Sequence, residues 1–338
     1  MSQIFWERLL AAIKAPFESF VSPQSSFHLL FLALTLLFCA GVYARHARRP
    51  LRLRTLRRFL LPRRVFLHAS AKLDYKYYVI AAALRAGMLG SMVVSSNVVA
   101  AGINALLAKT FGASAPLDAP LYVILPLATI VQVVLFDLGY WIAHRTMHEI
   151  PLLWEFHKTH HAAEVLTPAT SARSHPVDDL IQTNFIAGCL GLGYGVLVYL
   201  FGEAAQPITL FETNVIFFIY FLTIFHLRHS HIWLPIRGWL GYIIQSPAHH
   251  HIHHSTAPRH AGKNLGFSLS LWDWAFGTLY MPDKREQLEF GLGHESADFA
   301  SVGELLMRPF HNALRLLTSR AKPEPSSAPI PAVAKHET

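Results

Sequence analysis

Eight histidines in this chain fall into three short groups whose spacing could aim several imidazoles at one point. The eight residues are His144, His148, His157, His160, His161, His250, His253 and His254. The first two are four residues apart, and in each of the other groups the last two histidines follow the first by three and four residues. Side chains at these spacings share one face of a helix. Because imidazole is the commonest metal ligand and unpaired buried polar groups are costly, the pattern predicts a metal site.

The number of histidines suggests two metal ions. A tetrahedral zinc ion takes three or four protein ligands, and eight imidazoles exceed that need. The zinc-protease motif HExxH is absent, because Leu152 stands four residues after His148. Imidazole binds zinc, copper, iron and nickel alike, so the ligand type leaves the element open. We find no phosphate-binding glycine loop. The arrangement favours oxidation at an inert C–H bond, which needs a redox metal and O2 because protein side chains cannot supply that chemistry.

The composition indicates a membrane protein. The chain has 338 residues, of which 52% are hydrophobic and only 15% are charged, too few charges for an ordinary soluble domain. The net charge of +8 comes largely from an arginine-rich stretch at residues 45–64. We interpret this stretch as a cytoplasmic loop that attracts lipid phosphates, and we expect no nucleic-acid partner. The two cysteines, Cys39 and Cys189, lie in apolar runs and suggest neither a disulfide nor a metal site.

Five apolar segments could cross a membrane and predict an all-α fold, a multi-pass transmembrane helical bundle with a helical cap. The segments are 27–44, 78–100, 120–143, 181–202 and 207–226. Counting from the arginine-rich loop places all three histidine groups on the cytoplasmic face, where the cap would carry the metal site. The third segment runs directly into His144, and Pro151 suits the first turn of the next helix.

Four regions follow from this pattern. The N-terminal membrane region, residues 1–115, would contain an interfacial helix at 4–20, two spans and the arginine-rich loop. The other three are a catalytic domain at 116–285, a C-terminal amphipathic helix at 286–320 and a disordered tail at 321–338.

The three histidine groups, in this order, resemble the histidine boxes of the fatty acid hydroxylase and sterol desaturase superfamily of membrane di-iron oxygenases. The neighbouring residues that carry the resemblance are Asp137, Tyr140, Trp141, Leu153, Trp154, Phe156, Asn264, Trp272, Asp273, Phe276, Gly277 and Thr278. The resemblance covers about residues 120–285. The segment Pro247-Ala248-His249-His250 is most similar to the alkylglycerol monooxygenase and bacterial sterol desaturase branch.

The resemblance implies that the eight box histidines hold two iron ions and that a further ligand lies between the second and third boxes. His229 matches that ligand best, and His175 is the less certain alternative. Whether His226, His231 or His249 are ligands stays open.

Carboxylates near the histidines could orient their rings. Asp137 lies seven residues before His144, on the same stripe of a helix, and we expect it to accept a hydrogen bond from a ligand imidazole. Asp178 and Asp273 are weaker candidates for that role.

The resemblance predicts an integral-membrane oxidoreductase that uses O2 to hydroxylate or desaturate a lipid. The lipid could be a sterol, a hopanoid, an ether lipid or a fatty acyl chain. Electrons would come from a separate electron-transfer protein, and we expect the bacterial inner membrane with the active site on its cytoplasmic face. Two alternatives stay open: a zinc hydrolase at the membrane interface, and a metal-transport or metal-storage membrane protein.

Overall fold

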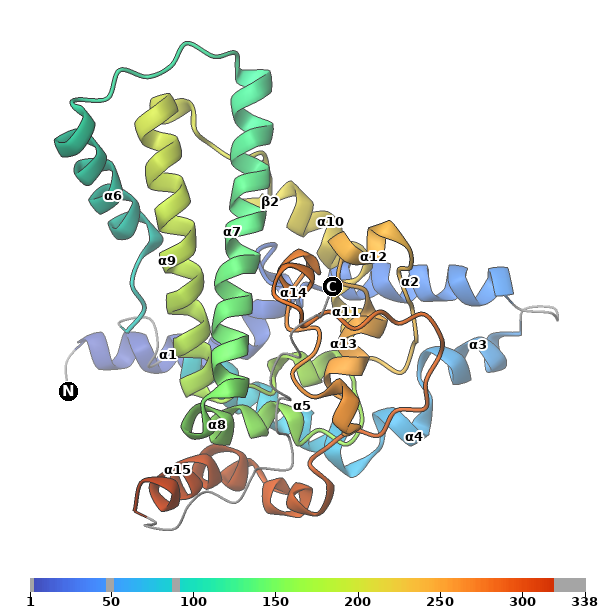
Figure 1. Ribbon diagram of the computed structural model, residues 1–338. Coiled ribbons are helices and arrows are strands. Elements are labelled where there is room, and N and C mark those ends of the chain that lie inside the picture. Colours follow the sequence, from blue (N-terminus) through green and yellow to red (C-terminus); the bar gives the residue numbers. More distant parts are fainter. Residues whose placement is uncertain (1–2, 47–51, 87–91, 319–338) are drawn as a thin grey trace, which may run out of the picture.

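The computed structural model describes residues 3–46, 52–86 and 92–318, and it is built mostly of helices (Figure 1). The two longest helices, α7 (Leu121–Glu149) and α9 (Pro176–Phe201), pack side by side, and α6 (Ser96–Phe111) packs against α9. Both α7 and α9 are long and apolar enough to cross a membrane. They are the two candidate spans among the described residues.

Glycines let these helices approach closely. A Cβ atom on Gly139 of α7 would lie 2.6 Å from the Cα of Ile186 on α9. A Cβ on Gly195 of α9 would lie 2.7 Å from the carbonyl oxygen of Ala100 on α6. Such small residues are typical of helix contacts in membranes, where close packing replaces the hydrophobic effect as the driving force.

The N-terminal helices run across the long axis of α7 and α9 (Figure 1). They are α1 (Gln3–Val21), α2 (Leu29–His46), α3 (Leu53–Leu60), α4 (Arg63–Phe66) and α5 (Ala69–Leu84). Helix α1 lies where the sequence predicts an interfacial helix. It packs against α5, and α5 packs in turn against a short 3-10 turn, η2 (Pro168–Ala172). The N-terminal region is therefore in contact with the part of the chain that carries the histidines.

Two of the five predicted spans are divided between separate secondary-structure elements. Within 78–100, helix α5 ends at Leu84 and α6 starts at Ser96, after Ser95 accepts a hydrogen bond from the Asn97 backbone N–H. Residues 87–91 of that segment lie outside the described residues. Within 207–226, a short hairpin of β1 (Thr209–Leu210) and β2 (Thr213–Asn214) precedes α10 (Val215–Thr223). Helix α10 has nine residues, and at about 1.5 Å per residue it is too short for a hydrocarbon core of about 30 Å.

The other three predicted spans and the predicted C-terminal helix all contain helical residues. The segment 27–44 forms α2, which is apolar but shorter than a candidate span. The segments 120–143 and 181–202 lie within α7 and α9. The C-terminal amphipathic helix is α15 (Val302–Thr318), and the predicted tail at 321–338 lies outside the described residues.

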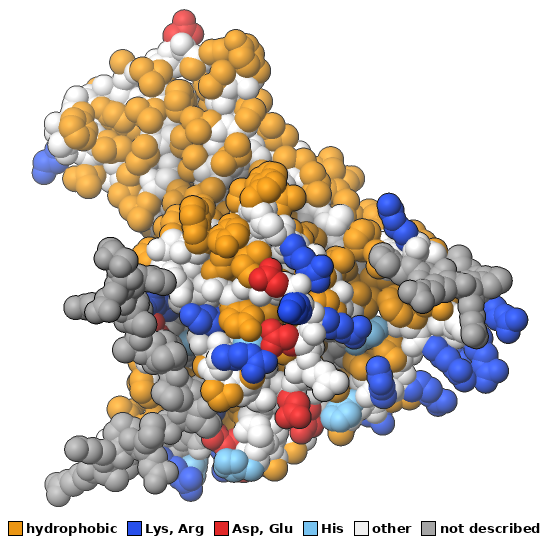
Figure 2. Space-filling view, turned by 45° about the vertical axis from the view of Figure 1, so that its right-hand side comes forward, with side chains coloured by type: hydrophobic (Ala, Val, Ile, Leu, Met, Phe, Trp, Pro, Cys, Tyr) orange, Lys and Arg blue, Asp and Glu red, His pale blue; other side chains and the backbone are white. Residues whose placement is uncertain are grey.

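Most of the short elements lie beside the lower half of α7 (Figure 1). They are α8 (Pro151–His161), α11 (Phe225–Arg228), α12 (Trp239–Ile243), α13 (Pro247–His253), η4 (Pro258–His260), α14 (Leu271–Ala275) and η5 (Gly293–Phe299). In contrast, η3 (Gly202–Ala204) follows the upper end of α9 and contacts α7 there. Figure 2 shows hydrophobic side chains over nearly all of the upper part of the molecule, and most of the charged side chains below it. The surface is thus amphipathic along the direction of α7.

Candidate metal centre

The histidines of the first two boxes come from two consecutive helices. His144 and His148 lie in the last turns of α7, which continues past the apolar segment to Glu149 as the sequence predicts. Ile150 ends α7 and also precedes α8, and Pro151 occupies the first position of α8. Proline suits that position because its missing N–H would have no partner inside the helix. The change of direction at Ile150 brings the histidines of α8 back towards those of α7.

The third box lies on α13, whose start is fixed by a reciprocal cap. The hydroxyl of Ser246 accepts a hydrogen bond from the His249 backbone N–H at 3.3 Å, and the Ser246 N–H donates to His249 Nδ1 at 3.1 Å. The ring of His249 is therefore held at the helix end.

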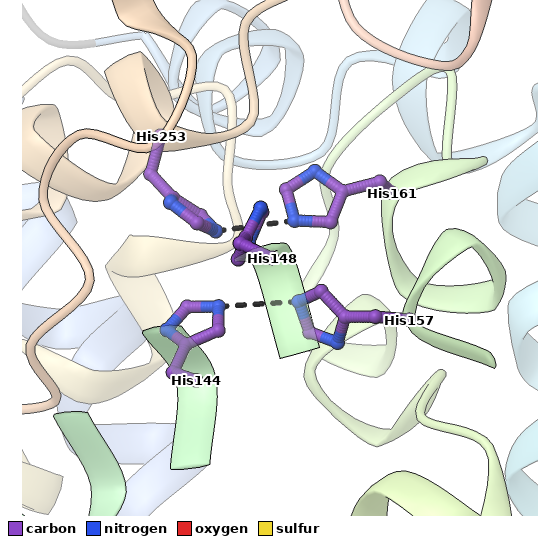
Figure 3. Close-up of side chains that lie close together, drawn as sticks. All are labelled: His144, His148, His157, His161 and His253. Atoms are coloured by element: carbon purple, nitrogen blue, oxygen red, sulfur yellow. Dashed lines mark hydrogen bonds between the residues drawn. The ribbon is translucent and has the colours of Figure 1, made fainter. Parts of the chain in front are cut away.

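Nine histidines form two clusters of potential ligand atoms. The first group contains His144, His148, His157, His161 and His253, and the second group contains His160, His229, His250 and His254. Within each group all ligand atoms lie within 4.8 Å of one another. Figure 3 shows the first group, with rings from α7, α8 and α13 directed at a common point.

The nitrogen separations fit ligands that share an ion. In the second group, His250 Nε2 lies 2.9 Å from His229 Nε2 and 3.1 Å from His254 Nε2. In the first group, His161 Nε2 and His253 Nε2 are 3.1 Å apart. Nitrogens bonded to one ion at about 2.0–2.1 Å are separated by roughly these distances. The two groups therefore fit two metal ions.

The two groups are interleaved along the chain. His160 and His161 are adjacent on α8 but belong to different groups, and so are His253 and His254 at the end of α13. The rings of His161 and His254 lie 4.7 Å apart, centroid to centroid. The two sites are thus neighbours, and each draws on more than one histidine box.

Burial keeps these histidines neutral. Removal from water, together with the nearby His253, lowers the pKa of His160 to about 3, and removal from water lowers the pKa of His253 to about 4. At neutral pH both rings are therefore uncharged, and an uncharged ring offers the lone pair that a metal needs.

Backbone carbonyls hold two rings of the first group in place. His144 Nδ1 lies 2.7 Å from the carbonyl oxygen of Leu265, and His253 Nδ1 lies 3.0 Å from that of Lys263. When Nδ1 donates to these oxygens, Nε2 carries the lone pair and faces the centre of the group. Such contacts orient metal-binding histidines and fix their tautomer.

Asp178, one of the two weaker carboxylate candidates, is the one that contacts a grouped imidazole. Its Oδ2 lies 3.1 Å from His157 Nδ1, and both side chains are buried. Asp273 supports His144 indirectly. Its Oδ1 accepts a hydrogen bond from the backbone N–H of Leu265, and the carbonyl oxygen of Leu265 contacts His144 Nδ1.

The expected role of Asp137 is not what the structure shows. Its carboxylate accepts hydrogen bonds from the backbone N–H groups of Phe267, Ser268 and Leu269 and from the Ser268 hydroxyl, at 2.5–3.1 Å. Asp137 does lie on α7 above the histidines, but the 267–269 loop covers that part of the helix. The carboxylate therefore holds the loop and no imidazole.

His175 belongs to neither group. Its Nδ1 accepts from the Val177 backbone N–H at 3.1 Å, which caps α9, and its Nε2 lies 3.0 Å from the carbonyl oxygen of Leu306 on α15. Both ring nitrogens are thus engaged away from the centre.

The other open histidines also lie outside the two groups. His231 Nε2 meets the carbonyl oxygen of Phe59, and His226 packs against Phe27 and Phe225.

No motif in the sequence points to Arg173. This side chain is 1% exposed and pairs with Asp74 of α5 at 2.9 Å. Its own carbonyl oxygen lies 3.3 Å from His160 Nδ1. The two partners are far apart in the chain, and Asp74 lies in a region without a recognisable motif, so no spacing could reveal the pair.

Two cavities border the histidine groups, and each is lined by a different set of residues. One, of about 260 Å³, is lined by His157, His160 and His229 together with Phe221, Phe225 and Phe267. The other, of about 270 Å³, is lined by His148, His161, His253 and His254 together with Trp154. The centre can therefore be approached from two sides.

Comparison with known proteins agrees with this geometry. The fatty acid hydroxylase family matches residues 129–278. The ornithine lipid hydroxylase OlsE of Rhizobium tropici is 30% identical over 163 residues, which cover 48% of this chain and 45% of that protein. Alkylglycerol monooxygenase of Homo sapiens is 28% identical over 183 residues, covering 54% and 36%. A Delta(7)-sterol 5(6)-desaturase of Gibberella zeae is 31% identical over 150 residues, covering 44% and 41%.

The chain spans less than half the length of these three relatives, and no solved structure matches it significantly. The matched segment nevertheless contains all nine grouped histidines. Over residues 129–278, the chain is similar to members of the fatty acid hydroxylase and sterol desaturase superfamily.

Proposed function

We propose that this protein is an integral-membrane di-iron oxidoreductase that uses O2 and external electrons to hydroxylate or desaturate a C–H bond of a lipid. One observation carries the proposal: two interleaved histidine groups lie at the end of an apolar helix long enough to cross a membrane. The printed names of the relatives, which include a lipid hydroxylase, a monooxygenase and a sterol desaturase, support the same class of reaction.

The nine grouped histidines would hold the two iron ions. Iron supplies the redox chemistry that activates O2 towards an inert C–H bond, which side chains cannot do. The chain itself holds the ligands: Leu265 and Lys263 carbonyls and the Asp178 carboxylate keep three Nδ1 atoms engaged, so that Nε2 faces inward. Burial of most of the ligand side chains also limits their contact with bulk water.

The substrate would enter through the cavity lined by Phe221, Phe225 and Phe267. An aromatic wall beside His157 and His160 suits an apolar chain. The relatives named above act, by their names, on an ornithine lipid, an alkylglycerol and a sterol. A lipid is the class that these names share, and the choice among sterol, hopanoid, ether lipid and fatty acyl chain is open.

The position in the membrane follows from charge. The arginine-rich stretch at 45–64 favours the cytoplasmic side, and α7 and α9 would place the metal centre near the same face. We propose the bacterial inner membrane, with electrons delivered by a separate protein at the cytoplasmic surface.

Metal analysis and isotope labelling test the proposal. Protein purified without oxygen should contain two iron ions per chain and should convert a lipid extract only when O2 and a reductant are added. With 18O2, one labelled oxygen atom in the product indicates hydroxylation, and loss of two hydrogens without label indicates desaturation. Zinc as the sole metal, at one ion per chain, with turnover that needs no O2 would instead support the interfacial zinc hydrolase.

A further inference from the structure

Arg228, the last residue of α11, is a buried cation beside the second group. It is 2% exposed. Its Nη2 lies 3.0 Å from His250 Nδ1 and donates to the carbonyl oxygen of Gly266 at 3.3 Å. The guanidinium lies 4.9 Å from the centre of the Phe267 ring, and its Nε atom is buried without a hydrogen-bond partner. These contacts are all with neutral groups.

Arg173, which is also fully buried, has the ion-pair partner that Arg228 lacks among the described residues. Arg173 has the carboxylate of Asp74 at 2.9 Å, whereas no carboxylate of the described chain forms an ion pair with Arg228. The side chains near the Arg228 guanidinium include Tyr140 and Tyr220, and neither is a carboxylate. A buried charge is costly unless a partner of opposite charge neutralises it. We therefore expect Arg228 to bind an anionic partner.

Arg228 lines the cavity that also borders His157, His160 and His229. Asp178 lines the same cavity, but its Oδ2 is engaged by His157 and it makes no ion pair with Arg228. The second oxygen of Asp178, Oδ1, is buried without a partner. The cavity therefore presents a guanidinium that has no ion-pair partner among the described residues, close to the metal centre.

We propose that Arg228 binds an anionic oxygen group, a carboxylate or a phosphate, of the lipid head group. The inference rests on the proposed function, because it assumes that the cavity takes the substrate. A guanidinium presents several N–H donors in a fixed plane and binds carboxylate and phosphate through charge-assisted hydrogen bonds. Only the ring of His250 separates the guanidinium from the donor atoms of the second group. The oxidised carbon should therefore lie close to the head group and not far along the chain.

Binding measured without turnover tests this subsite. The purified, metal-containing protein in dodecyl maltoside, under argon and without a reductant, is titrated calorimetrically with dodecanoate, dodecyl phosphate and dodecan-1-ol. We expect at least one anion to bind more tightly than the alcohol, and Arg228→Met to weaken that anion about tenfold to hundredfold while leaving the alcohol unchanged. If Arg228→Met weakens the binding of dodecanoate alone, the head group that Arg228 binds is a carboxylate. If it weakens the binding of dodecyl phosphate alone, that head group is a phosphate.

Two results would overturn the inference. One is equal binding of the alcohol and both anions to the unmodified protein. The other is unchanged anion binding in Arg228→Met, which would mean that the metal ions hold the anion.

Arg145→Met is the matched control, because Arg145 pairs with Glu149 outside the cavity, and it should bind all three probes normally. If Arg228→Met does not retain metal, Arg228→Gln replaces it, since glutamine keeps a polar side chain beside His250 without the charge. Normal anion binding in Arg228→Gln also refutes the subsite. Because no turnover is needed, failure to find an O2-dependent product leaves this result standing.

Discussion

The two histidine groups differ in what holds their rings. In the first group, three of the five rings have an acceptor for Nδ1: Leu265 for His144, Asp178 for His157 and Lys263 for His253. In the second group, only His160 has one, the Arg173 carbonyl at 3.3 Å.

The remaining rings of the second group lack such an acceptor. The Nδ1 atoms of His229 and His254 are buried without a partner in the described chain, and that of His250 faces the Arg228 guanidinium. Contacts of this kind fix the tautomer and orientation of a ligand. The first group is therefore organised by the protein before metal binds, whereas the second depends more on its ion.

The largest effect should come from removing a ligand of the organised group. His157→Ala takes away a ring that lies 3.2 Å from His144 Nε2, and we expect the protein to lose about half of its metal and all measurable turnover. Metal analysis and product assay of the membrane-extracted protein measure this. His175→Ala is the control, because that ring lies in neither group, and it should keep both ions. Full metal content and activity in His157→Ala would refute the assignment of the first group.

Removal of the acceptor behind that ring should have an intermediate effect. In Asp178→Ala, His157 keeps its place in the chain but loses the carboxylate that fixes its tautomer. We expect metal affinity of the first group to fall about 10- to 100-fold, with Asp178→Asn between this variant and the unmodified protein because the amide oxygen still accepts. Competition with a chromophoric chelator gives the affinities.

The neighbouring carboxylate supplies the control for that experiment. Asp179 pairs with Arg85 at 2.6 Å and contacts no grouped histidine. Asp179→Ala should leave both metal affinities unchanged. An equal loss in Asp178→Ala and Asp179→Ala would mean that the start of α9, and not the contact with His157, is responsible.

The histidine spacing predicts which residues come together at the metal centre but not how they are divided between the two groups. Helical periodicity predicts that His157, His160 and His161 share one face of α8, and in the structure all three rings belong to the two histidine groups. It cannot tell that His160 and His161 belong to different groups, because that depends on the approach of α11 and α13 from distant parts of the chain.

Long-range contacts also explain the other differences. Asp137 and His144 do lie on the same helix, but Asp137 binds a loop that is about 130 residues away in the sequence. Apolarity identifies α7 correctly, yet the apolar segment 78–100 is divided between α5, which ends at Leu84, and α6, which starts at Ser96. An apolar run indicates burial, and whether lipid or protein covers it is decided by the rest of the fold.

Partial removal of metal tests the comparison directly. Because its rings are less constrained, the second group should release its ion first when the protein is dialysed against EDTA, with an affinity about tenfold lower than that of the first group. Timed metal analysis should show two phases. His254→Ala should abolish the fast phase, and His157→Ala should abolish the slow one. A single phase in the unmodified protein would show that the acceptors behind the first group do not affect retention.

The smallest effect on the metal centre should come from Asp137→Asn. This carboxylate holds the 267–269 loop through four hydrogen bonds, and asparagine has one acceptor oxygen where aspartate has two. Leaving buried donors unpaired costs about 1–3 kcal/mol, so the variant should unfold at a lower temperature in detergent. Metal retention should stay close to normal, because the Asp273 contact with the Leu265 N–H keeps the His144 acceptor in place. A metal loss as large as that of Asp178→Ala, at an unchanged unfolding temperature, would mean that Asp137 orients a ligand after all.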